Sequence, residues 1–143
     1  MALEWTEPEL LDPAWVEGLL GPDKMFGLVE EDVLGHKLPV FALRPRSIRE
    51  VLLDGAAQHG DREALIGHEW TVTFAQLPAE AAAVALRLRD HYGVEPGDRI
   101  GFAGIPSVEH VVSLWAAISM GAVAATFNPA WTVDEFNYAI ATT

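Results

Sequence analysis

Residues 94–128 read V-E-P-G-D-R-I-G-F-A-G-I-P-S-V-E-H-V-V-S-L-W-A-A-I-S-M-G-A-V-A-A-T-F-N, and the architecture follows from this segment. After Val94 comes the turn Glu-Pro-Gly-Asp, in which proline presets φ and glycine accepts a positive φ. The apolar residues 99–103 then predict a short strand. Gly104 and Pro106 interrupt the apolar run, and Ser107 is a favourable helix N-cap.

A helix and a second strand complete the segment. The pattern predicts a helix over residues 108–120, ended by Gly121 where a positive φ is favoured. Residues 122–127 predict the second strand. A strand, a helix and a strand with short connections indicate a βαβ unit, with parallel strands and a right-handed crossover. We therefore expect an α/β fold with a mainly parallel sheet, flanking helices and a β-hairpin.

The central helix is apolar around most of its circumference. A helix of this kind is buried on more than one side, and its apolar residues are Val108, Val111, Val112, Leu114, Trp115, Ala116, Ala117, Ile118 and Met120. The two strands also lack clean alternation, as parallel strands covered on both faces do. We therefore expect this unit to pack against more structure than 143 residues easily provide.

Composition restricts the class of protein. A chain of 143 residues with half of them hydrophobic fits one globular domain. The net charge of −12 disfavours nucleic acid and anionic membrane surfaces as partners. There is no cysteine, the first residues are acidic rather than signal-like, and no apolar run has the length of a membrane span. We expect a cytoplasmic protein.

Residues 1–46 are expected to form an N-terminal extension that packs on a domain spanning residues 47–143. Asp12-Pro13 predicts the start of a short helix that carries Trp15 and Leu19 on one face. The acid run at residues 30–32 is typical of a solvated loop or turn. Residues 38–43 fit a short strand or an extended strap.

Three capping boxes mark further helices. The box at residues 47–50 starts a helix that ends near His59, and the box at residues 73–76 starts one that ends at Tyr92. Pro78 would lie just past the first turn of this second helix, where its ring could kink it. The third box, residues 132–135, starts a helix with Phe136 and Ile140 on one face. Between the first two helices, residues 64–72 predict a β-hairpin around Gly67.

No motif in the chain carries recognisable chemistry. The sequence Gly101-Phe102-Ala103-Gly104 has two of the three glycines of a dinucleotide fingerprint, and a tight strand-to-helix turn explains it better. Glu109 and His110 are adjacent on one helix and so point to different sides. The histidines have no metal-ligand spacing, and those at 59, 68 and 91 are expected at exposed positions: His36, His59, His68, His91 and His110. We therefore predict no catalytic, cofactor-binding or metal-binding residue.

From Ser47 onward, the order of these pieces resembles the N-terminal region of the adenylate-forming enzymes, in particular the acyl-CoA synthetases of the AMP-binding family. The resemblance covers about two thirds of the chain, and its pieces are residues 47–50, Ala56-Ala57, 64–66, 73–77, 93–100, 107–109, 121–123, Asn128-Pro129 and 132–136. Departures from the family pattern at Pro106, Ser119 and Thr126 leave the subfamily open.

The resemblance implies a parent enzyme that activates a carboxylic acid with ATP through an acyl-adenylate and then transfers the acyl group to CoA, as in fatty acid metabolism. It also implies that the phosphate loop, the adenine-binding residues, the Mg-associated acidic residue and the catalytic lysine all come later than Thr143. We therefore expect an incomplete N-terminal subdomain that is inactive alone and holds no cofactor, whereas the parent uses ATP, Mg and CoA.

Other interpretations remain open. The chain could be a self-standing interaction module of the same fold, or a small nucleotide-binding α/β protein. We also expect a homo-oligomer, because Val111, Leu114, Trp115 and Ile118 would be covered on one side only. The central helix or an open sheet edge would then form the interface, with exchange of the helix from Thr132 as a further form.

Overall fold

A computed structural model of the chain describes residues 18–143, apart from residues 22 and 25. The chain divides into two compact units, residues 1–45 and residues 46–143, and each is described by itself. In the first unit, residues 18–20 are helical, and the helix start expected at Asp12 lies outside the described residues. The expected packing of the N-terminal extension on the domain stays a prediction.

The first unit contains a β-hairpin, of which the sequence predicted only the second strand, over residues 38–43. Strands β1 (Leu28–Val33) and β2 (His36–Phe41) pair antiparallel around Leu34 and Gly35, whose φ values are 54° and 83°. The acid run therefore lies in a strand, and the prediction of a solvated loop is wrong. One exposed cross-strand ion pair accompanies these acids, with Lys37 Nζ 3.2 Å from Glu30 Oε1.

The second unit begins with helix α2 (Ile48–His59) and the hairpin of β3 (Glu63–Ile66) and β4 (Thr71–Thr73). Ser47 caps α2 as predicted, accepting the Glu50 N–H at 3.1 Å. The Glu50 carboxylate bonds the N–H of Arg46, whereas the reciprocal bond of a capping box would go to Ser47. The antiparallel hairpin around Gly67 is confirmed.

Helix α3 (Leu77–Tyr92) begins later than its capping box predicts. The box itself forms, since the Thr73 N–H donates to Gln76 Oε1 at 3.0 Å and the Gln76 N–H donates to Thr73 Oγ1 at 3.2 Å. It closes a turn that precedes the α-helix, however. Pro78 therefore falls in the first helical turn, where an N–H has no intrahelical partner, and the predicted kink is wrong.

The predicted βαβ unit is confirmed. It consists of β5 (Arg99–Ala103), α4 (Val108–Ser119) and β6 (Val123–Phe127), and the strands are parallel, with Arg99 paired with Val123. Ser107 caps α4 by accepting the His110 N–H at 3.1 Å, and Gly121 has φ 87°. The α/β class is therefore confirmed, with two strands in each of the three sheets of the described part.

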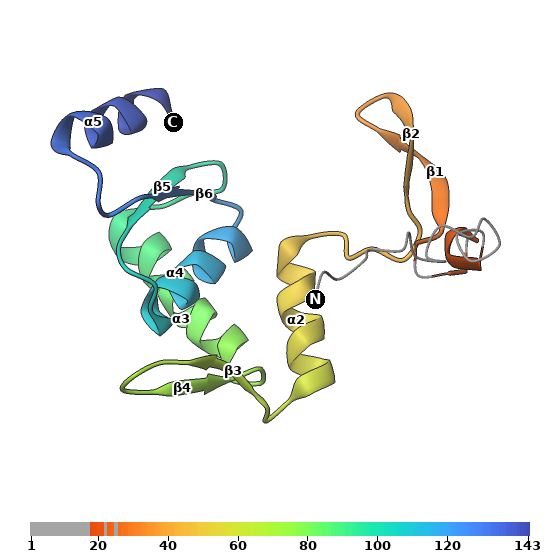
Figure 1. Ribbon diagram of the computed structural model, residues 1–143, viewed down its shortest axis with the longest axis horizontal. Helices are drawn as coiled ribbons and strands as arrows, with labels where there is room; N and C mark the ends of the chain where they lie inside the picture. Colours follow the sequence, from red (N-terminus) through yellow and green to blue (C-terminus); the bar gives the residue numbers. More distant parts are fainter. Residues whose placement is uncertain (1–17, 22, 25) are drawn as a thin grey trace, which may run out of the picture. The chain divides into compact units, whose positions relative to one another are not determined.

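The core of the second unit lies where α2, α3, α4 and the β3–β4 hairpin meet (Figure 1). Every residue of α4 except Glu109 is buried or half-buried, which confirms burial of the helix on more than one side. Packing of an aliphatic side chain contributes about 1.5–3 kcal/mol, and the buried cluster comprises Leu52, Val72, Leu77, Ala81, Val108 and Val112.

Strands β5 and β6 are covered less than expected. The side chains of Ile100 and Phe102 turn toward α4 and are half-buried, whereas Arg99, Gly101 and Ala103 are exposed. On this second face lies α5 (Val133–Thr142), a helix with no buried residue (Figure 1). The prediction of strands covered on both faces is therefore wrong, because α5 covers only part of the outer face in the described chain.

The contact of α5 with the outer face of the β5–β6 sheet depends on Gly101. A Cβ atom added at Gly101 would lie 2.8 Å from Cε2 of Phe127. The Phe127 ring is in turn 5.2 Å from the ring of Phe136 on α5, in an edge-to-face arrangement. Gly101 thus lets β5 pass under the aromatic ring that holds α5 on the sheet.

We expect Gly101→Ala to lower the free energy of unfolding by about 1–3 kcal/mol, because Phe127 must move and its contact with α5 weakens. Gly104→Ala is the matched control, since a Cβ atom there meets only His110 Nδ1 at 3.6 Å. The control should stay within about 1 kcal/mol of the wild type. Urea unfolding of the three proteins measures this, and equal stability of the Gly101 variant and the control would contradict the packing role.

Candidate functional site

A cleft of about 660 Å³ lies between the β3–β4 turn and the start of α4 in the second unit. We call it the hairpin–helix cleft; it is lined by residues 64–70 of the hairpin and by Ile105, Pro106, Ser107, Val108, Glu109 and Val111. Gly67 allows the two walls to approach closely because it has no side chain. A Cβ atom there would lie 2.7 Å from Val108 Cγ2 and 2.9 Å from the Trp70 carbonyl oxygen.

One hydrogen bond joins the two walls of this cleft. Trp70 Nε1–H donates to Glu109 Oε1 at 2.7 Å, over a separation of 39 residues in sequence. The backbone N–H of Glu109 itself, the Trp70 indole and the Ser107 hydroxyl hold the pKa of Glu109 below its ordinary value of 4.5. The first turn of a helix also favours a carboxylate. Glu109 is therefore an anion that links the hairpin to α4.

The start of α4 is already occupied by this carboxylate. A helix N-terminus can bind a phosphate through its free N–H groups, but here Ser107 Oγ and Glu109 take up groups of the first turn. The glycines of the preceding strand also have structural roles, because Gly101 makes room for Phe127. This geometry fits a tight strand-to-helix turn, and the absence of nucleotide binding stays a prediction.

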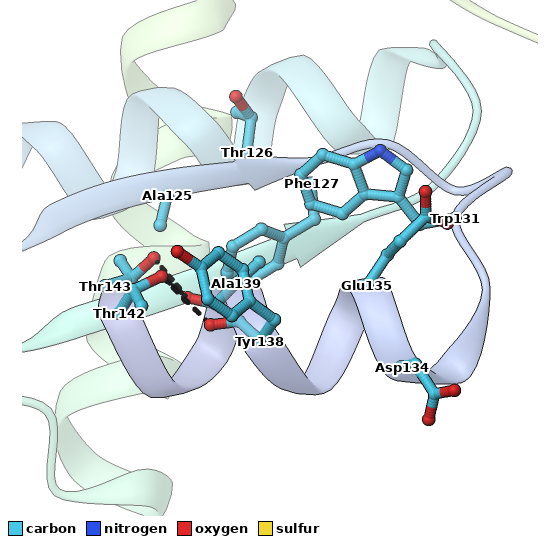
Figure 2. A pocket seen from close by; sticks show the side chains of 10 residues that line it. All are labelled: Ala125, Thr126, Phe127, Trp131, Asp134, Glu135, Tyr138, Ala139, Thr142 and Thr143. Carbon is cyan, nitrogen blue, oxygen red and sulfur yellow. Dashed lines mark hydrogen bonds between the residues drawn. The ribbon is translucent and has the colours of Figure 1, made fainter.

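A second hollow lies beside α5. Figure 2 shows Phe127, Trp131 and Tyr138 around it, with Ala125 pointing toward α5 and Thr126 pointing away. Its volume is about 700 Å³. Helix α5 satisfies its own polar groups, since Thr142 Oγ1–H donates to the Tyr138 carbonyl at 2.9 Å and Glu135 accepts the Thr132 N–H at 2.8 Å. Hydrogen bonds from Thr132 lower the pKa of Glu135.

The histidines lie apart. The ring of His59 is half-buried, 4.8 Å from Phe74, which corrects the expectation that it is exposed. His110 turns to Phe102, 5.9 Å away, while its neighbour Glu109 turns to Trp70, so the two diverge as predicted. Among the described residues, no three His, Asp or Glu side chains gather in a way that could hold a metal ion.

The comparisons with known proteins agree with the fold. The model of the AMP-binding enzyme family matches residues 52–143, and the chain belongs to this family. Within it, the chain is 36% identical over 91 residues to the mitochondrial medium-chain acyl-CoA ligase ACSF2 of Bos taurus, covering 62% of the chain and 15% of that ligase. It is 30% identical over 84 residues to nonribosomal peptide synthetase 30 of Fusarium vanettenii, covering 59% of the chain and 1% of the synthetase.

A solved structure shares the fold. The N-terminal subdomain of Klebsiella oxytoca NpsA matches with a TM-score of 0.64 at 20% identity, over 68% of this chain and 25% of that one. The predicted relation to the N-terminal region of adenylate-forming enzymes is therefore confirmed. The chain spans only a small part of the length of the relatives that it matches.

We expect Trp70→Phe to raise the pKa of Glu109 toward its ordinary value, because the indole donor is lost. Glu109, with its lowered pKa, stabilises the fold above about pH 4.5, and this stabilisation is lost as the pH falls through the folded-state pKa. The variant should therefore lose less stability on acidification than the wild type does.

Carboxylate chemical shifts followed by NMR during a pH titration measure this effect. Glu135 is the internal control, because its pKa is lowered by Thr132 and should not change. The variant Thr132→Val should raise the pKa of Glu135 and leave the pKa of Glu109 unchanged. An unchanged Glu109 titration in Trp70→Phe would show that the link does not form.

Proposed function

We propose that the chain is the N-terminal part of an acyl-CoA ligase that activates a carboxylic acid with ATP through an acyl-adenylate and transfers the acyl group to CoA. The observation that carries this proposal is the family match over residues 52–143, together with its acyl-CoA ligase relatives. A nonribosomal peptide synthetase is also among the relatives. A carboxylic acid as the substrate and CoA as the final acceptor of the acyl group are therefore parts of this proposal.

The role we assign to these 143 residues is structural. Residues 46–143 hold a βαβ unit and a hairpin against α2 and α3. Ser107 and Thr132 cap helices there, and Trp70 and Glu109 form one link. The sequence holds no phosphate-cradling glycine loop, and its lysines are Lys24 and Lys37, both outside residues 46–143. The proposed catalytic groups, ATP, Mg and CoA therefore belong to the longer enzyme.

The alternative is a non-catalytic interaction module of the same fold. The observation that favours it is that residues 46–143 form one compact unit in which α4 is packed by its own chain. The coding sequence beyond the codon for Thr143 separates the two proposals. A continuing frame with a Gly/Ser/Thr-rich loop supports the ligase, and a stop codon supports the module.

A further part of the proposal concerns where in the cell the protein is found. We assign the protein to the cytoplasm, because a chain without cysteine suits a reducing compartment. Among the described residues, no helix combines the length and apolarity that crossing a membrane requires.

We also propose that the chain self-associates. Because α2, α3, β5 and β6 pack around α4, the central helix is disfavoured as the interface and an open sheet edge is favoured.

We expect this polypeptide to catalyse no exchange of pyrophosphate into ATP with fatty or aromatic acids, because it lacks the groups that bind and polarise the phosphates. The measurement uses the repurified chain, a no-enzyme blank and bovine ACSF2 as the positive control. Exchange above the blank that persists through repurification would overturn the structural role.

A further inference from the structure

A groove lies between helices α2 and α3 of the second unit, and we call it the α2–α3 groove. Residues of both helices and of the end of α4 line it, and its volume is about 480 Å³. The Ala75 N–H donates to the Gly60 carbonyl at 2.8 Å, which places the start of α3 beside the end of α2. Helix α2 therefore runs toward the β3–β4 hairpin and α3 runs away from it (Figure 1).

The walls of this groove are apolar. Leu53 of α2 and Leu86 of α3 line it, and they are 48% and 50% exposed. The lining residues of α3 recur every three or four positions from Pro78 to Arg89, so they form one stripe about 16 Å long. At positions 81, 82 and 85 this stripe has only alanine methyl groups, which leave the groove hollow. An aliphatic chain along the stripe would remove apolar surface from water.

Two arginines lie at the end of the groove that is remote from the hairpin. Arg49 is in the first turn of α2 and Arg89 is in the last turn of α3, and the opposite directions of the helices bring these turns to the same end. In the described part of the chain, Arg49 forms no ion pair. Arg89 Nε donates to Asp90 Oδ1 at 2.7 Å. A guanidinium has five N–H donors, so Arg89 retains donors for a further acceptor.

Ser119 contributes a third donor at this end. Helix α4 begins beside the hairpin, where Val108 lies close to Gly67, so its last residue Ser119 lies toward the arginines. The Ser119 hydroxyl is buried, and within the residues that the structure describes it has no hydrogen-bond partner. Buried polar groups are nearly always paired. An acceptor that reaches this end of the groove would therefore satisfy a donor that the described chain leaves unpaired.

The charge of the groove is opposite to that of the chain. The sequence has 21 acidic and 9 basic residues, yet two arginines and no Asp or Glu line the α2–α3 groove. In the hairpin–helix cleft, by contrast, Glu69 and Glu109 are among the lining residues. An apolar wall with a basic end favours a ligand that has an aliphatic chain and an anionic end group.

We propose that the α2–α3 groove binds a single-chain anionic amphiphile, with the aliphatic chain along α3 and a carboxylate or phosphate end group on Arg49 and Arg89. The guanidinium fork matches the geometry of both end groups, and the volume lies within the range of small-molecule sites. The lining residues all lie between positions 49 and 120, so the site needs no residue outside the described chain. This proposal goes beyond the ligase function and does not rest on it.

Titration of the full chain with decanoate and with decyl phosphate, below the concentrations at which they form micelles, tests the proposal. Followed by NMR, the methyl signals of Leu53 and Leu86 and the Nε–H signal of Arg49 should shift and saturate. At least one of the two probes should bind about fivefold or more tightly than decanol, which has the same chain and no charge. The better probe identifies the end group. A shift that does not saturate, or equal binding of decanol, would overturn the site.

Matched variants locate the end group. Arg49→Gln should raise the dissociation constant of the better probe about fivefold or more. Arg87→Gln removes the same charge from α3 outside the groove, and it should change the constant less than about twofold. Equal effects of these two variants would show that the groove does not hold the anion.

A second pair of variants locates the aliphatic chain. Ala82 lines the groove and Ala83 does not, and both are exposed on α3. Leucine is a good helix former, so Ala82→Leu and Ala83→Leu should both fold. Ala82→Leu fills the groove and should abolish saturable binding, whereas Ala83→Leu should leave it unchanged. Binding that persists in Ala82→Leu would place the chain elsewhere and overturn the proposal. Neither pair of variants bears on the ligase parentage, which the pyrophosphate-exchange assay and the coding sequence address.

Discussion

The packing of α4 inside its own chain is the constraint on which the second unit depends. Ala116 and Ala117 have no exposed surface and Val112 is 3% exposed, so the helix has small and branched side chains where its neighbours approach. Because α2, α3, β5 and β6 all contact it, one apolar helix organises most of the unit. This cover comes from residues 46–143 and corrects the expectation that Val111, Leu114, Trp115 and Ile118 would be covered on one side only, since all four are half-buried.

The polar groups around α4 have structural roles. The polar groups near α4 are engaged locally, with Ser107 as its cap and Glu109 bonded to Trp70. The outer face of β5–β6 remains partly open, since α5 rests there mainly through Phe127 and Phe136. In an enzyme of the AMP-binding family, such a unit would supply a rigid support to which other parts of the chain are added, and this agrees with the structural role proposed above.

The sequence predicts those elements whose signals are local. Ser107, Gly121 and the apolar runs beside them suffice for the βαβ unit, because caps and strand turns act within a few residues. The turn and the first strand of the hairpin in the first unit were missed because Leu34 takes a positive φ, 54°, in a turn usually made by asparagine and glycine. In the candidate site, the Trp70–Glu109 bond spans 39 residues and no periodicity reports it. The resemblance to the AMP-binding family supplies the fold but matches no site residue.

We expect residues 46–143 to form one cooperative unit around α4, and native-state hydrogen exchange tests this expectation. The amides of Val112, Ala116 and Ala117 should exchange most slowly, with the opening free energy of global unfolding. Those of α5 should exchange faster, because that helix has no buried residue. Exchange of α4 as fast as that of α5 would contradict the claim, since α4 would then not be the centre of the fold.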